Sequence, residues 1–180
     1  MAEIVKFADY PSFTPNQTPR QMFEAGIFGG SYFRPIHSAV TDQDYTDQHV
    51  QHKCLKGIPE ALVCNSKAVV RVNKYKVSAG SSLEEWEAAG WIVEQDPYGW
   101  VQWYVRFYEG RRSPDDARQI DRWNKFAGPK SGRFRTQLIN KIKAAGGDID
   151  NYTISPVVRQ GLLQWGYELT QDDYDAKVKK

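Results

Sequence analysis

Residues 96–126 read DPYGWVQWYVRFYEGRRSPDDARQIDRWNKF, and this stretch decides the expected fold. It holds three of the six tryptophans and eleven charged residues, so it must present an apolar side and a charged side. After Pro97 the aromatic rings recur at Trp100, Trp103, Tyr104, Phe107 and Tyr108. Because positions i, i+3, i+4, i+7 and i+8 share one face of a 3.6-residue period, the stripe predicts a helix that ends near Gly110.

A second helix is predicted to follow directly. Ser113-Pro114-Asp115-Asp116 combines a capping serine, a proline at the first helical position and two acids at the positive end of the helix dipole. Further helices are predicted at 18–25, 82–90, 133–145 and 156–165, from capping residues at their starts and glycines near their ends. The β-branched run at 67–77, KAVVRVNKYKV, predicts a strand, and 61–64 predicts a shorter partner strand.

The length fits one domain. A chain of 180 residues buries roughly 70% of its unfolded surface on folding, so it needs no metal or disulfide for stability. We expect a mainly helical α+β single domain at 1–180, with short N-terminal strands packed against a C-terminal bundle of about four helices. Within it we expect an extended N-terminal arm at 1–16, a basic helical core at 96–166 and a polar tail at 170–180.

Composition also limits location and cofactors. No apolar run approaches the roughly 18 residues that span a bilayer, and the N-terminus lacks the apolar core of a secretion signal. The sequence therefore predicts a soluble cytoplasmic protein with no membrane partner. Cys54 and Cys64 are not spaced as CxxC and are expected to be free thiols. His49, His52 and Cys54 match no standard zinc module, so we predict no metal site and no cofactor.

Charge is unevenly distributed along the chain. Between residues 98 and 145, eleven Lys and Arg against four Asp and Glu give a local charge of +7, and the net charge of +2 leaves −5 for the rest. This asymmetry suggests nucleic acid or another polyanion as a partner, because Lys and Arg neutralise phosphates. The alternative is an ordinary solvated face in which the arginines pair with neighbouring carboxylates. The candidate anion-binding residues are Arg111, Arg112, Arg118, Arg122, Lys130, Arg133 and Arg135.

A second hypothesis is a small enzyme, or a binder, for an aromatic or anionic metabolite in an aromatic-walled pocket. The candidate lining residues are Tyr32, Arg34, Tyr104, Tyr108 and Asp116. Tyr32 and Arg34 follow Gly29-Gly30, a pair that could cradle an anion or a flat ligand, or could simply make a tight turn. An aromatic stripe at helical spacing is also what a packed core requires. No nucleophile elbow, metal motif or dinucleotide fingerprint defines a reaction, so enzymatic activity is left open.

A third hypothesis is a protein-interaction module, in which the acidic N-terminal part and the basic C-terminal part contact different surfaces or each other. Three stretches also carry a resemblance: GGSYFRP at 29–35, DPYGWVQWYVRFYEGRRSPDDARQIDRW at 96–123 and SPVVRQGLLQWGYEL at 155–169. Together they resemble a family of small proteins from varied organisms, over most of the chain. That family has no assigned activity, so the resemblance implies no catalytic or binding residue.

Overall fold

The computed structural model describes residues 3–179 and contains, within that range, seven α-helices, five short 3-10 turns and one two-stranded sheet. The helices are α1 (Pro19–Ala25), α2 (Leu83–Ala88), α3 (Trp100–Tyr108), α4 (Asp116–Ala127), α5 (Arg133–Ala144), α6 (Pro156–Gln164) and α7 (Gln171–Val178). The strands β1 (Ile36–Ser38) and β2 (Gln43–Tyr45) pair antiparallel, with Ile36 opposite Tyr45. The predicted mainly helical α+β class is confirmed.

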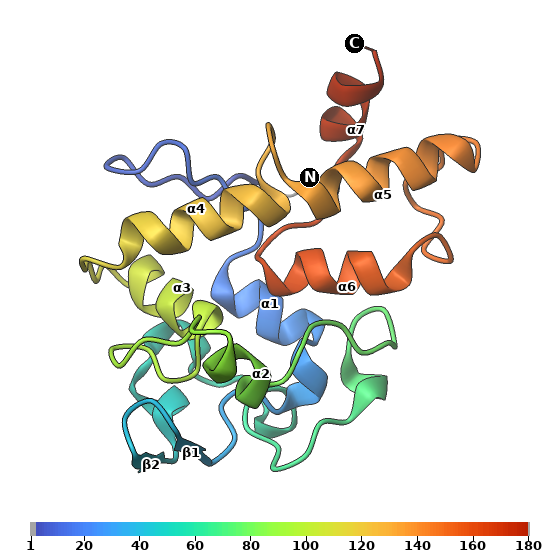
Figure 1. Ribbon diagram of the computed structural model, residues 1–180. Coiled ribbons are helices and arrows are strands. Elements are labelled where there is room, and N and C mark those ends of the chain that lie inside the picture. The colour runs from blue at the N-terminus through green and yellow to red at the C-terminus, as the bar shows by residue number, and fades with distance from the viewer. Residues whose placement is uncertain (1–2, 180) are drawn as a thin grey trace.

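The helices α4, α5, α6 and α7 lie at one end of the molecule, and α2 lies at the other end with the hairpin and the short turns. In Figure 1, α4 and α5 lie across the top, α6 runs below α5, and α2 and the β1–β2 hairpin lie at the bottom. α4, α6 and α7 each pack against α5, and α1 packs against α3. One cluster of buried side chains extends from Phe13 to Tyr174. None of the helices in the described range is long and apolar enough to cross a membrane.

The N-terminal arm was predicted to be extended at 1–16, but residues 3–16 contain turns in which the amides of Tyr10 and Phe13 donate to the carbonyls of Phe7 and Tyr10; residues 1 and 2 lie outside the described range. Phe13 is fully buried, and its ring centroid lies 5.2 Å from that of Trp123. The Phe7 ring contacts the Phe107 ring edge-on at 4.8 Å. The N-terminal arm therefore adds the rings of Phe7 and Phe13 to the aromatic core.

The start of α3 differs from the prediction. Asp96 does not cap this helix, which begins four residues later, after Gly99. Asp96 is instead fully buried, and its carboxylate accepts hydrogen bonds from Arg106 and Arg111. The capping boxes predicted for α1 and α2 are both present, with Thr18 accepting a hydrogen bond from the Gln21 amide in the first of them. Because the Asp96 carboxylate is held in a buried ion pair, it does not cap α3.

The predicted strand at 67–77 and its partner at 61–64 are wrong. Only 3-10 turns occur there, η4 (Glu60–Leu62) and η5 (Val70–Val72). The amides of Val69 and Lys74 donate to the carbonyls of Gly29 and Gly26, at 2.9 and 3.1 Å. Because these bonds wrap the segment around the turn after α1, no extended neighbour pairs with it, and its β-branched residues do not act as strand formers.

Gly29 and Gly30 lie in the tight turn η1 (Phe28–Gly30), with φ of +62° and +75°. A Cβ on Gly30 would lie 2.0 Å from the backbone oxygen of Ala61, so a side chain is excluded there. The amide of Asn65 also donates to the Gly30 carbonyl at 2.9 Å. The paired glycines therefore let residues 61–73 approach the backbone closely.

Residues 171–178 of the polar tail predicted at 170–180 form the helix α7, and residue 180 lies outside the described range. The Thr170 side chain caps this helix by accepting from the Asp173 amide. Tyr174 is only 7% exposed, and Asp173 pairs with Arg135 of α5 at 2.7 Å. Tyr174, Val178 and the ion pair of Asp173 therefore hold a largely polar sequence against the bundle.

Candidate ligand site: a tryptophan-lined cavity

A cavity of about 380 Å³ opens between α2, α4, α5 and α6, and four of the six tryptophans line it. These are Trp86, Trp91, Trp100 and Trp165. Trp100 is buried and Trp91 is 42% exposed, so the aromatic wall reaches from the core to the surface. Trp165 packs against Trp100 at 4.8 Å and stacks on Phe126 at 4.6 Å. We call this site the tryptophan cavity; its volume lies within the usual range for small-molecule sites.

Arg122 of α4 is the central polar group of the tryptophan cavity. Its guanidinium carbon lies 5.5 Å from the Trp91 ring and 5.4 Å from the Trp165 ring, and its Nη1 donates to Gln119 Oε1 at 3.0 Å. Among the described residues no carboxylate pairs with it. Burial, with repulsion from Arg118, lowers the pKa of Arg122 to about 10, so it remains charged at neutral pH. A partly desolvated cation without a counter-ion favours the arrival of an anion.

A second cation and two amides complete the polar part of the lining. The Arg133 guanidinium lies over Phe126 at 4.5 Å and over Phe134 at 5.2 Å. Gln137 and Gln164 supply side-chain amides, and no Asp or Glu lines the cavity. The tryptophan cavity is therefore positively charged and flat-walled, which are two features that suit a planar anion.

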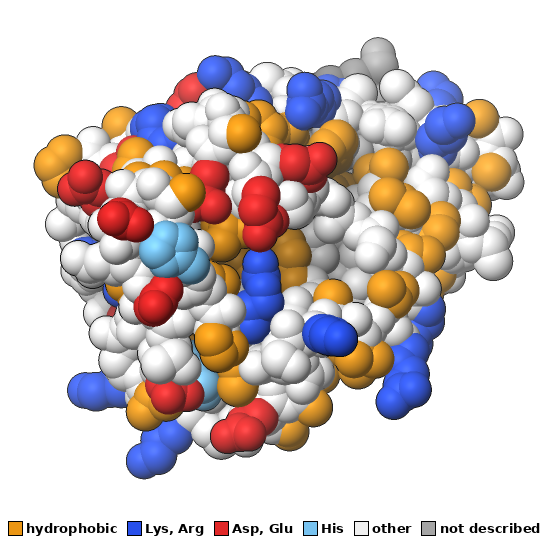
Figure 2. Space-filling view, turned by 60° about the horizontal axis from the view of Figure 1, so that its bottom comes forward, with side chains coloured by type: hydrophobic (Ala, Val, Ile, Leu, Met, Phe, Trp, Pro, Cys, Tyr) orange, Lys and Arg blue, Asp and Glu red, His pale blue; other side chains and the backbone are white. Residues whose placement is uncertain are grey.

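A second cavity of about 370 Å³ adjoins the first and shares Phe28, Tyr32, Trp86 and Gln164 with it. Its lining is more polar, with serines at 31, 66, 78, 81 and 82. Arg34 donates to the Ser31 carbonyl at 3.2 Å and forms no ion pair within residues 3–179. Figure 2 brings the α2 and hairpin half of the molecule forward and shows a hollow that holds apolar side chains and a cationic one.

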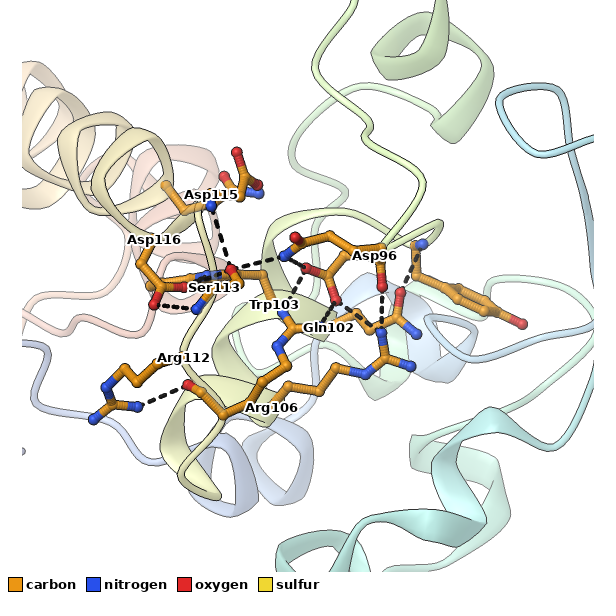
Figure 3. A network of polar contacts seen from close by, with 12 residues as sticks. Asp96, Gln102, Trp103, Arg106, Arg112, Ser113, Asp115 and Asp116 are labelled. Carbon is orange, nitrogen blue, oxygen red and sulfur yellow. Dashed lines mark hydrogen bonds and ion pairs between the residues drawn. The ribbon is translucent and has the colours of Figure 1, made fainter.

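The structure places the seven predicted anion-binding residues in two groups. Four arginines are each bound to a carboxylate, with Arg111 on Asp96, Arg112 on Asp9, Arg118 on Asp115 and Arg135 on Asp173. Figure 3 shows Arg106 directed at Asp96 as well, and Trp103 directed at Asp116. Arg122, Lys130 and Arg133 form the second group and have no such partner within residues 3–179. For four of the seven, the charge is therefore balanced by a carboxylate within the fold.

The five predicted pocket residues are also divided. Tyr32 lines both cavities and Arg34 lines the second, whereas Tyr104, Tyr108 and Asp116 line neither. Tyr104 is fully buried, and its hydroxyl donates to the Gln17 carbonyl at 2.8 Å. Asp116 accepts from Trp103 Nε1 at 2.8 Å. Most of the α3 aromatic stripe is therefore core packing, and only Trp100 of this stripe reaches the cavity.

Sequence reasoning missed Trp86, Trp91 and Trp165 as ligand-site residues. Their positions in the sequence could have indicated a site, because each tryptophan lies within three residues of the C-terminal end of α2 or α6. A large ring at such a position is only partly covered by its own helix. The sequence could not show that the ends of α2 and α6 lie close together, since about seventy residues separate Trp91 from Trp165. The 78–82 loop, which lines the second cavity, carried only the helix cap at Ser82, which indicates the start of α2 and not a ligand site.

His52, Cys54 and Glu109 form a separate polar cluster that resembles a nucleophile with its base. His52 Nδ1 lies 2.9 Å from Glu109 Oε2, and the Cys54 amide donates to Glu109 Oε1 at 2.8 Å. Burial and the Glu109 carboxylate raise the pKa of the Cys54 thiol to about 12. A thiol that stays protonated is a poor nucleophile, so this cluster fixes structure. No group of three or more potential metal ligands occurs in the part of the chain that the structure describes.

No family model, curated protein or solved structure shows significant similarity to the chain. The chemistry of the tryptophan cavity is therefore inferred from its own residues. Among residues 3–179, no His, Cys, Lys, Asp or Glu lines it; its hydroxyl groups are those of Ser81 and Tyr32, and burial raises the pKa of Tyr32.

Proposed function

We propose that the protein binds a small planar anion in the tryptophan cavity, with the flat part between the indole rings and the negative group on Arg122. The observation that carries this proposal is a guanidinium between Trp91 and Trp165 that has no carboxylate partner in the described residues. The other predicted arginines on α4 and the preceding loop are satisfied by Asp9, Asp96 and Asp115. Arg122 therefore has binding capacity that the fold does not use.

The expected selectivity follows from the charge. A hydrogen bond to a charged group contributes about 1.5–3 kcal/mol, which corresponds to a preference of about tenfold or more for an anion over a neutral molecule of the same shape. The rings would accept many flat molecules, since stacking depends little on substituents. The charged group thus sets the class of ligand and the aromatic walls set its shape.

The test compares a naphthalene carboxylate with the matching naphthalene carboxamide by quenching of tryptophan fluorescence. We expect the carboxylate to bind at least about tenfold more tightly. Arg122→Gln should abolish this preference. Lys125→Gln is the matched control, because Lys125 lies on the same helix but is exposed and paired with Asp121 at 2.7 Å. Equal binding of the two probes to the unmodified protein, or binding of neither, would contradict the proposal.

A further inference from the structure

A cationic strip runs along the outer face of α5 and begins at the tryptophan cavity. Its cations are Lys130, Arg133, Lys141 and Lys177, and none of the four forms an ion pair within residues 3–179. Thr136, Gln137 and Asn140 lie between them, and no Asp or Glu lines this shallow surface. We call it the α5 strip.

Helical spacing explains why these side chains line up. Arg133, Gln137 and Lys141 are four residues apart and therefore share one face, which extends about 12 Å along the helix. The opposite face carries Leu138, Ile139 and Ile142, which are buried in the core. Since the core holds α5 by that face, the cations on the outer face keep a fixed order.

The α5 strip and the tryptophan cavity are continuous. Arg133 and Gln137 line both of them. Arg133 lies over Phe126 and Phe134 and is thus part of the aromatic lining as well as of the cationic strip. A ligand with one group in the tryptophan cavity can therefore extend from the cavity along the α5 strip. Such a ligand would carry a flat group at one point and a row of negative charges beyond it.

We infer that the ligand is single-stranded nucleic acid, with one base in the tryptophan cavity, the phosphate of that nucleotide on Arg122 and the following phosphates on the α5 strip. This inference rests on the proposed function, because the base must enter the same cavity. Single-strand binding sites combine aromatic stacking platforms with a positive track for the backbone. A duplex does not fit, since its bases are stacked on one another and reach an enclosed cavity only when they are flipped out. An acidic peptide would match the strip but would leave the cavity unused.

The test measures binding of deoxyadenosine monophosphate and of a deoxyadenosine hexanucleotide at about 50 mM salt and above. We expect the hexanucleotide to bind at least about tenfold more tightly. Its log affinity should fall with log salt with a slope of about −3.5, which is about 0.7 for each of five cations, namely Arg122 and the four of the α5 strip. The double change Lys141→Gln/Lys177→Gln should reduce the slope to about −2.1 and leave the mononucleotide affinity unchanged. Lys53→Gln, an exposed change on η3 (Lys53–Leu55), should alter neither affinity.

Arg122→Gln separates base binding from simple charge attraction, because it should weaken both nucleotides. A sulfated oligosaccharide, which has charge but no bases, should bind weakly and should not respond to this change. The inference fails if the hexanucleotide gains nothing over the mononucleotide, or if a duplex, a glutamate peptide or the oligosaccharide binds as tightly as the hexanucleotide. If the naphthalene carboxylate still binds in that case, the proposed function stands. If no aromatic anion binds, both proposals fail.

Discussion

Asp96→Asn is expected to be the most destabilising single change among the ion pairs of this protein. Asp96 is fully buried and accepts hydrogen bonds from Arg106 Nη1 at 2.9 Å and from Arg111 Nη1 and Nη2 at 2.8 and 2.6 Å. Gln95 donates a fourth, at 2.9 Å. Asparagine keeps the shape of the side chain but removes the charge. The two guanidiniums, whose side chains are 20% and 28% exposed, would then repel each other without a counter-ion.

The size of the effect follows from this geometry. Removing one partner of a buried ion pair costs about 3–5 kcal/mol, because it leaves an uncompensated charge. Since both arginines reach water in part, we expect the lower end, about 3 kcal/mol. A chain of this size loses about 2–4 °C in Tm per kcal/mol, so Tm should fall by about 6–12 °C. Because proteins have a total free energy of unfolding of about 5–15 kcal/mol, a loss of about 3 kcal/mol is a large fraction of it.

The assay is urea denaturation with thermal unfolding, with Asp9→Asn as the matched control. Asp9 also holds an arginine with two hydrogen bonds, at 2.6 and 3.2 Å to Arg112, but its side chain is 51% exposed. Because solvent screens that pair, Asp9→Asn should destabilise the protein far less than Asp96→Asn. Combining Asp96→Asn with Arg111→Met should recover part of the loss, since the two sites are coupled. An Asp96→Asn protein no less stable than the control would refute our assignment of Arg111 to structure.

Three further outcomes are expected. Gly30→Ala should destabilise the protein by more than about 3 kcal/mol in urea denaturation, because its Cβ would lie 2.0 Å from a backbone oxygen, whereas Gly57→Ala, with nothing within 4 Å, should cost about 1 kcal/mol. Burial lowers the pKa of His52 below 6.5, so the unfolded chain takes up the proton first and the free energy of unfolding should drop as pH falls below about 6.5. His52→Gln should flatten that part of the stability–pH curve. Tyr174→Ala should cost about 3 kcal/mol and lower the helical circular dichroism signal, as α7 separates from α5.

The helices were predictable where local signals and burial agree. Thr18 and Ser82 both cap helices, and the rings after Pro97 lie on one helix as their spacing requires. The absence of a strand at 67–77 was not predictable, because the backbone partners of this segment are the carbonyls of a glycine turn some forty residues earlier. A propensity for extended structure becomes a strand only when an extended neighbour is available to pair with it. No local pattern reports whether that neighbour exists.

The sequence also could not show which of the positive charges would be paired in the fold. A count of charges between 98 and 145 gives +7, but it treats Arg111 and Arg122 as equivalent. Folding separates them, because Arg111 meets a buried carboxylate and Arg122 meets indole rings. Only the second leaves a cation whose charge is not balanced within the described fold. The excess of charge in the sequence therefore carries less functional information than the pairing of each charge. Of the five cations between 98 and 145 that form no ion pair within residues 3–179, four line the tryptophan cavity or the α5 strip.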